Sequence, residues 1–219
     1  DHQDRKTRIA EQLENVAASK QLQPVVDDNL LDEVTGLVEW PNVIMGQIET
    51  EFMSLPPEVL VTSMRVHQKF FALSQKGATE NLAPFFMTVT NRRSDLVNDK
   101  LIAAGNERVL RARLADAKFF YEQDKQTPMD SLAEKLEVIT FYEGLGSVAD
   151  KAERMAALAG AIANYLDAAD PDTARRAAVL AKVDLASEMV GEFPELQGIM
   201  GGYYATAAGE AADVAEAMS

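Results

Sequence analysis

Helical spacing of apolar side chains is clear in the amino-terminal part of the chain. Over residues 3–19 the apolar positions recur every three or four residues, at Ile9, Leu13 and Val16, which predicts an amphipathic helix. The stretch NLLDEVTGLVEW indicates a second, shorter helix. A third is predicted over PEVLVTSMRVHQKF, because Pro57 and Glu58 are residue types favoured in a first helical turn.

Strand patterns lie between and after these helices. Pro41 interrupts the helical pattern, and VIMGQIETEF follows it with β-branched residues and partial alternation, which indicates a strand. FFALSQ and PFFMTVTN are also typical of strands. The segment KGATENLA between them contains glycine and asparagine, so we expect an antiparallel hairpin with a loose loop.

Every segment after Asn91 has helical periodicity. Helices are expected near residues 96–123, 129–139, 148–168, 171–190 and 194–218. The predicted fold class is therefore α+β, with a small mixed part over residues 1–95 and an all-helical part over residues 96–219.

Three glycines stand inside the last predicted helix, in the stretch ELQGIMGGYYA. They are Gly198, Gly201 and Gly202, and each costs about 1 kcal/mol relative to alanine within a helix. Gly198 and Gly202 would share one helical face, where another helix could approach closely. We expect this stretch to be a helix start or a bend that packs tightly.

Composition sets limits on the possible chemistry. The chain has 219 residues, of which 47% are hydrophobic, so it can bury a sizeable core. It has no cysteine, which excludes disulfides, thiolate metal sites and thiol catalysis.

No apolar run approaches the ~20 residues of a membrane span, and DHQDRKTRIAEQ is too charged for a signal peptide. We expect no membrane partner and a cytoplasmic location. Because the chain begins at Asp1 and ends within a helical pattern, we expect it to be a piece of a longer protein.

Charge is distributed unevenly along the chain. The formal net charge is −14, yet residues 65–118 contain ten Lys or Arg against five Asp or Glu, a local surplus of five positive charges. From Val183 onward there are seven acidic residues and no basic one. A basic middle between acidic ends indicates one surface that could face a polyanion. Chance clustering on solvated faces is the alternative, and composition alone does not choose between them.

The segment GNERVLRARLADAKFFYEQD, residues 105–124, contains the densest basic cluster. At 100° per residue its apolar side contains Leu110, Leu114, Ala117 and Tyr121, and we place Arg108, Arg111 and Lys118 together on the other side. These three are candidates for phosphate contact, whereas Arg113 falls at the edge of the apolar side and is more typical of a structural role. Arg92 and Arg93, which follow the second hairpin strand, could extend the same surface.

No catalytic constellation is visible in the sequence. His67 lies on a predicted helix without a neighbouring nucleophile or second ligand, and His2 lies at the terminus. Glu188 and Glu192 stand one helical turn apart but are typical of a solvated pair, so no metal site is predicted. Phosphate-loop, GxSxG and HExxH motifs are all absent.

Several long stretches resemble the beta subunit of bacterial two-subunit glycyl-tRNA synthetases. They occur in order from about Leu31 to Glu210, as VEWPNVIMGQIETEFMSLPPEVLVTSMRVHQKFFAL, GNERVLRARLADAKFFYEQD, EGLGSVADKAERMAALA and AKVDLASEMVGEFPELQGIMGGYYA. The resemblance implies that residues 1–95 correspond to the end of a module similar to B3/B4 of phenylalanyl-tRNA synthetase. Residues 96–219 would correspond to a domain similar to the HD phosphohydrolases. Lys182 and Asp184 would then occupy a degenerate HD position, and without histidine in this half the domain would lack metal and phosphohydrolase activity.

The same resemblance implies a function in glycine–tRNA ligation. In that family the alpha subunit uses ATP and glycine, so we expect no cofactor in this chain and no catalytic residue of its own. Its expected partners are the alpha subunit, tRNA(Gly) and the remaining beta-subunit domains. Arg92, Arg93, Arg108, Arg111 and Lys118 are then the candidate RNA contacts. Two alternatives remain: a purely structural docking module without RNA contact, and a live metal-dependent phosphohydrolase, against which the missing histidines argue.

Overall fold

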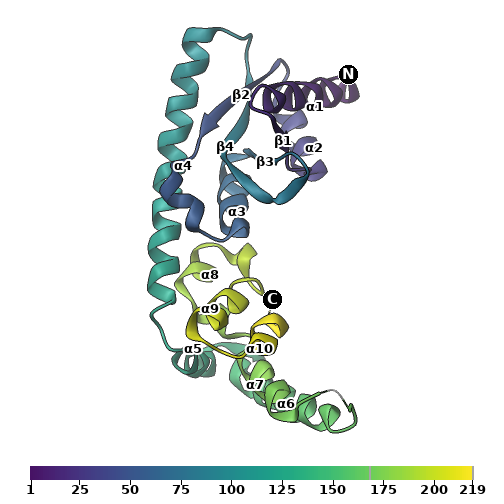
Figure 1. Ribbon diagram of the computed structural model, residues 1–219, viewed down its shortest axis with the longest axis vertical. Helices are drawn as coiled ribbons and strands as arrows, with labels where there is room; N and C mark the ends of the chain where they lie inside the picture. Colours follow the sequence, from purple (N-terminus) through teal and green to yellow (C-terminus); the bar gives the residue numbers. More distant parts are fainter. Residues whose placement is uncertain (168, 219) are drawn as a thin grey trace. The chain divides into compact units, whose positions relative to one another are not determined.

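The computed structural model describes residues 1–167 and 169–218 (Figure 1). They form two compact units, Asp1–Lys118 and Phe119–Ser219. A small antiparallel sheet with helices makes up the first unit and the second is mainly helical, so the α+β prediction is confirmed. The units divide within the long helix α4 (Leu96–Asp124), whereas the predicted domains divide at residue 95. The likeness of the two domains to B3/B4 and HD folds stays a prediction.

The sheet of the first unit has four strands in the order β1-β3-β4-β2, all antiparallel. The strands are β1 (Leu22–Pro24), β2 (Pro41–Gln47), β3 (Phe71–Gln75) and β4 (Ala78–Asn91). The predicted hairpin is confirmed as β3 and β4, but the expected loose loop is a tight turn at Gly77, whose φ is +78°. The strand predicted over VIMGQIETEF ends at Gln47, and the 3-10 helix η1 (Thr50–Ser54) follows it.

Three helices of the first unit, α1 (His2–Ala18), α2 (Asp28–Leu37) and α3 (Pro57–Gln68), confirm the predicted ones. In Figure 1, α1 and α2 lie beside the sheet. Their apolar faces close one core with the strands, through side chains that include Ile9, Leu13, Val34, Leu73 and Met87. Aspartate side chains cap both helices, because Asp1 accepts from the backbone of Asp4 and Asp27 from that of Leu30.

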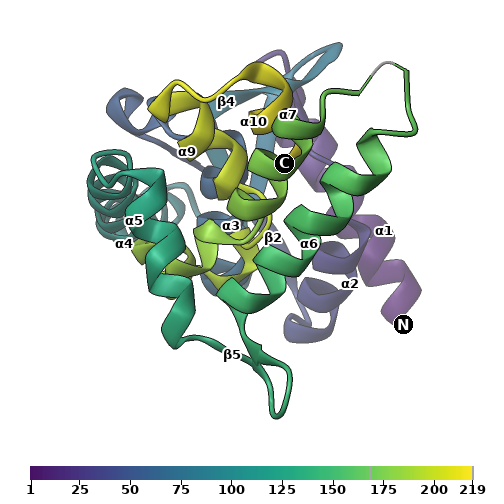
Figure 2. The same ribbon diagram turned by 90° about the horizontal axis from the view of Figure 1, so that it is seen from below.

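The second unit consists of short helices joined by turns. They are α5 (Met129–Lys135), η2 (Leu136–Val138), α6 (Val148–Ala163), α7 (Pro171–Leu180), η3 (Val183–Ala186), α8 (Glu188–Glu192), η4 (Pro194–Leu196), α9 (Met200–Ala208) and α10 (Ala212–Ala217). A small hairpin of β5 (Thr140–Tyr142) and β6 (Gly146–Ser147) precedes α6. Figure 2 shows α6 and α7 side by side.

Two long helices predicted for this unit are each broken in the structure. The one expected over 171–190 divides into α7, η3 and α8, because the Ser187 side chain accepts from the Val190 N–H and starts a new helix. The one expected over 194–218 divides into η4, α9 and α10, with Gly209 in a left-handed conformation at the end of α9. The helix expected over 148–168 ends at Ala163, and Ala168 lies outside the described residues.

The three glycines of ELQGIMGGYYA serve different needs. Gly198 precedes α9 and turns the chain with a φ of +86°, so it does not share a helical face with Gly202 as predicted. Gly201 is buried in α9, where an added Cβ would lie 3.3 Å from Met218 Cε. The stretch is thus a turn followed by a tightly packed helix start, which confirms the predicted bend.

Among the helices of the described residues, none combines the length and the apolar character that crossing a membrane requires.

Candidate nucleic-acid interface

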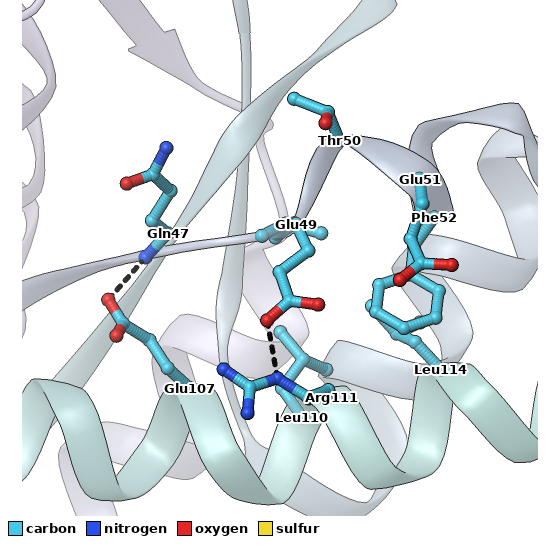
Figure 3. A pocket seen from close by; sticks show the side chains of 10 residues that line it. Gln47, Glu49, Thr50, Glu51, Phe52, Glu107, Leu110, Arg111 and Leu114 are labelled. Carbon is cyan, nitrogen blue, oxygen red and sulfur yellow. Dashed lines mark hydrogen bonds and ion pairs between the residues drawn. The ribbon is translucent and has the colours of Figure 1, made fainter.

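The basic residues of α4 meet acidic residues of the segment after β2. Here a cavity of about 550 Å³ is lined by Gln47, Ile48, Glu49, Thr50, Glu51, Phe52, Glu107, Leu110, Arg111 and Leu114 (Figure 3). Arg111 Nε lies 2.5 Å from Glu49 Oε1, and Lys118 Nζ lies 2.8 Å from Glu51 Oε2. Both of these candidate RNA contacts are therefore engaged in ion pairs within the first unit.

These ion pairs correct the predicted faces of the helix. Leu110 and Leu114 are buried, and Arg111 and Lys118 border this apolar stripe instead of lying on the side opposite to it. The helical angles explain the difference, since residues 111, 114 and 118 fall within one narrow sector at 100° per residue. Their long side chains reach past the stripe to the glutamates. The interface between α4 and η1 is apolar at its centre and ionic at its border.

Arg108 differs from its two neighbours. Its side chain is exposed, and within the described residues it forms neither an ion pair nor a hydrogen bond. Its positive charge is therefore available to an external anion. Of the three basic candidates on α4, Arg108 is the one whose contact with phosphate would break no internal pair.

Arg92 and Arg93 belong to a separate cluster around Trp40. Arg93 Cζ lies 5.3 Å from the centroid of the Trp40 ring, and Arg8 Cζ from α1 lies 4.9 Å from it. Arg92 Nη2 is 3.8 Å from Asp95 Oδ2. A cavity of about 400 Å³ adjoins this cluster, lined by Arg8, Glu11, Gln12, Asn15, Trp40, Pro41, Asn42, Arg92 and Ser94. We call Arg8, Trp40, Arg92 and Arg93 the Trp40 cluster.

Hydrogen bonds from side chains to the backbone hold the segments of the Trp40 cluster in place. Asn91 Oδ1 accepts from the N–H groups of Glu39, at 3.1 Å, and Trp40, at 2.8 Å, which ties the loop before β2 to the end of β4. Gln12 donates to the carbonyl of Pro41 and accepts from the N–H of Val43. It therefore fixes α1, which carries Arg8, against the start of β2.

The five predicted RNA contacts all lie in the first unit but not in one place. Arg92 and Arg93 lie in the Trp40 cluster. Arg111 lines the cavity beside η1, called here the η1 cavity, Lys118 pairs with Glu51 of the same segment, and Arg108 is exposed on α4. Sequence reasoning missed Arg8 and Trp40. Arg8 comes from a helix far away in the sequence. The antiparallel pairing of β2 and β4 brings Trp40 to Arg93, and the packing of α1 on β2 brings Arg8 to the same ring. The one available signal was Trp40 itself, the single tryptophan of the chain, next to the proline that starts a strand.

The predicted degenerate HD position lies in the core of the second unit. Asp184 is buried and accepts a hydrogen bond from the Gly198 N–H, and burial raises the pKa of its carboxyl group. Lys182 is half-buried nearby in sequence. In the described part of the chain, no three His, Cys, Asp or Glu side chains are grouped so that they could hold a metal ion. The equivalence of this position to an HD site stays a prediction.

A second buried carboxylate, Asp124, lies at the end of α4. It accepts from the backbone of Glu188 at 3.0 Å and Met189 at 2.9 Å, and from the Tyr204 hydroxyl at 2.8 Å. Burial, with Asp124 beside it, raises the pKa of Tyr204 well above its usual range. These three donors hold the Asp124 carboxylate against α8 and α9, which gives it a structural role.

Comparison with known proteins gives the family. The model of the family described as glycyl-tRNA synthetase beta subunit matches residues 1–219. The glycine–tRNA ligase beta subunit of Azotobacter vinelandii is 47% identical over 218 residues, which are 100% of this chain and 31% of that protein. The beta subunit of Bacillus subtilis is 47% identical over 98% of this chain and 31% of its own length. The chain spans about a third of the length of these relatives. It belongs to the glycyl-tRNA synthetase beta subunit family.

Proposed function

We propose that this chain is a tRNA-recognition and assembly part of a glycine–tRNA ligase. Its match to the beta-subunit family over residues 1–219 carries the proposal. In the complete enzyme it would support the ATP-dependent attachment of glycine to tRNA(Gly) in the cytoplasm. ATP and glycine would be used by the alpha subunit, and this chain would hold no cofactor and no catalytic residue.

The distribution of available cations supports RNA recognition by the first unit. Arg8, Arg93 and Arg108 form no ion pair within the described residues, so phosphate contact would not require breaking one. Arg111 and Lys118 must exchange a carboxylate for a phosphate, and the loss of the exposed ion pair, about 0–1 kcal/mol, offsets part of the gain. We therefore rank Arg93 and Arg108 above Arg111 and Lys118 as phosphate contacts. Arg92 ranks between these two groups, because its guanidinium lies 3.8 Å from the Asp95 carboxylate.

The proposal is tested by binding of tRNA(Gly) to the 219-residue chain across a salt series. Arg93→Ala and Arg108→Ala should each weaken binding and reduce the slope of log K against log salt by about 0.7 to 0.9, the value for one lost phosphate contact. The combined change Arg111→Ala and Lys118→Ala should have a smaller effect. Arg154→Ala, which removes one exposed arginine from the second unit, is the matched control. Absence of salt-sensitive binding, or equal binding by all variants, would contradict RNA recognition.

A docking module is the second candidate, and the surface of α6 favours it. Leu158, Ile162, Tyr165 and Leu166 are large apolar side chains, each more than half exposed, at helical spacing along α6 and just beyond its end. Exposed apolar side chains at this spacing are typical of a surface that packs on another protein. If docking is the function, Leu158→Glu with Ile162→Glu will abolish co-purification with the alpha subunit, and no arginine change will alter aminoacylation. If RNA recognition is the function, the arginine changes will raise the KM for tRNA(Gly) in the assembled enzyme.

A further inference from the structure

We propose that the Trp40 cluster binds an unpaired nucleobase of RNA by stacking, with Arg92 and the two stacked arginines next to the phosphates. The inference rests on the proposed function and deepens it, because it names the part of the RNA that this surface takes. Its starting point is the position of Trp40. This side chain is 45% exposed and lies outside the buried core of the first unit.

The chemistry of the cluster fits a flat, aromatic and anionic ligand. The guanidinium carbons of Arg8 and Arg93 lie within about 6 Å of the ring centroid, the range of a cation–π contact. Unpaired bases in RNA are bound by stacking on aromatic rings and on guanidinium planes, so this arrangement already contains both kinds of surface. A base could extend the stack on an arginine or replace one of them on the ring.

Charge at the cluster favours a nucleotide over a neutral aromatic ligand. Neither Arg8 nor Arg93 forms an ion pair within residues 1–167 and 169–218. Asp95 is the nearest carboxylate to Arg92, at 3.8 Å, and Glu11 is the acidic residue that lines the adjoining cavity. The positive charges of the cluster are therefore only partly balanced. Phosphates linked to a stacked base would complete the balance.

The cavity next to the ring is lined by polar side chains. Besides Arg8 and Arg92, its lining includes the side chains of Gln12, Asn15, Asn42 and Ser94. Amide and hydroxyl groups of this kind can donate to and accept from base edges and the 2′-hydroxyl of ribose. Gln12 is already committed to the backbone of Pro41 and Val43, and Asn42 and Ser94 both donate to the carboxylate of Asp99, so Asn15 is the better candidate.

The cluster is held in position before any ligand arrives. The backbone N–H of Trp40 donates to the Asn91 side chain, and Gln12 anchors α1 to the start of β2. Such anchoring lowers the conformational entropy that would be lost when a base stacks. A duplex presents no free base face along its length, so it can contact the arginines but not the stack. The cluster therefore discriminates unpaired from paired RNA.

The fluorescence of Trp40 gives a direct test, because Trp40 is the single tryptophan of the chain. The 219-residue chain is titrated with tRNA(Gly), a short single-stranded RNA, a mononucleotide, a blunt-ended RNA duplex and polyglutamate. We expect saturable quenching by tRNA(Gly) and the single strand, weaker binding of the mononucleotide and no quenching by the duplex. Quenching by polyglutamate with none by RNA would overturn the proposal in favour of an acidic protein partner. Tighter binding of the mononucleotide than of the strand would assign the surface to a free nucleotide and also overturn it.

Variants measured with labelled RNA separate stacking from charge. Trp40→Ala should weaken binding of the single strand about tenfold or more, as expected for the loss of one base–aromatic stack, and leave duplex binding unchanged. Trp40→Phe keeps an aromatic face and should lose less. Arg154→Ala is the charge control, and the thermal transition of each variant confirms folding. If tRNA(Gly) binds with salt dependence but Trp40→Ala and Trp40→Phe bind like the parent chain, this inference fails while the proposed function stands. If no RNA binds at low salt, both fail.

Discussion

At the scale of single residues, two buried carboxylates organise the second unit. Asp124 satisfies the first N–H groups of α8 and the hydroxyl of Tyr204, and Asp184 satisfies the N–H of Gly198. Both therefore fix short segments that have too few residues to be stable as isolated helices. Removing either carboxylate leaves buried N–H or O–H donors without an acceptor. This should lower the free energy of unfolding more than the loss of an exposed charge does.

Asp124→Ala is predicted to lower the free energy of unfolding by about 3 kcal/mol, because two backbone N–H groups and a hydroxyl lose their buried acceptor. Tyr204→Phe removes only one of these hydrogen bonds and should cost about 1 kcal/mol. Urea unfolding monitored by circular dichroism measures both. Asp116→Ala, at an exposed position of the same helix, should stay within about 0.5 kcal/mol of the parent chain. Equal effects at positions 116 and 124 would contradict the structural role.

The raised pKa of Asp184 predicts a pH-dependent cost to stability. Since burial raises the carboxyl pKa in the folded state, the folded chain binds the proton more tightly than the unfolded chain does. Stability attributable to this group is therefore highest at low pH and is lost as pH rises from about 3.9, the ordinary aspartate value, through the raised value. Asp184→Asn keeps an oxygen that can accept from Gly198 but cannot ionise. The unfolding free energy of the variant relative to the parent chain should increase between pH 4 and 7, and a difference that stays constant would contradict the assignment.

At the scale of elements, glycine positions explain where predicted helices end. Gly198 lies at φ +86° in the turn before α9, whereas Gly191 lies inside α8 with no atom within 4 Å of an added Cβ. The same substitution should therefore have opposite effects. Gly198→Ala should destabilise the chain by about 1 kcal/mol or more, because alanine is strained in the left-handed region. Gly191→Ala should stabilise it by up to about 1 kcal/mol. Thermal melts of the two variants test this, and stabilisation by both would show that the turn at Gly198 is not required.

The ion pairs between α4 and the η1 segment predict a second element-scale effect. Glu49→Gln with Glu51→Gln releases Arg111 and Lys118 from their carboxylate partners. Exposed pairs of this kind contribute only about 0–1 kcal/mol each, so the fold should tolerate the change. Affinity for tRNA(Gly) at low salt should rise if the η1 cavity is near the RNA. Unchanged affinity would remove Arg111 and Lys118 from the RNA surface.

The elements that could be predicted from sequence are those with strong local signals. Apolar spacing predicted α1, proline and glutamate in the first turn predicted α3, and two strand-like runs around a segment with glycine and asparagine predicted the β3–β4 hairpin. β1 was missed because three residues are too short for a pattern, and its pairing with β3 is a tertiary contact. Tertiary contacts also explain why the candidate site could be predicted only in part. Arg92 and Arg93 could be proposed from sequence, but their meeting with Arg8 at Trp40 depends on the sheet, and so does the pairing of Arg111 with Glu49.

At the scale of the whole molecule, the two units differ in net charge. Residues 1–118 contain 14 Lys or Arg and 17 Asp or Glu, a net charge of −3, whereas residues 119–219 contain 7 and 18, a net charge of −11. Both units are net negative, the second much more strongly, so electrostatic attraction for RNA is expected from the local basic clusters of the first unit. The exposed apolar side chains of α6 are then better suited to protein contact than to RNA contact.

Ultraviolet cross-linking of tRNA(Gly) to the 219-residue chain, with mass spectrometry of the linked peptides, tests RNA recognition most directly. If the first unit recognises RNA, cross-links will fall on its peptides that contain Trp40, Arg93 or Arg108, at a yield that falls as salt is raised. Cross-links confined to residues 119–218, or none at low salt, would contradict it and would leave this part of the beta subunit as a docking module.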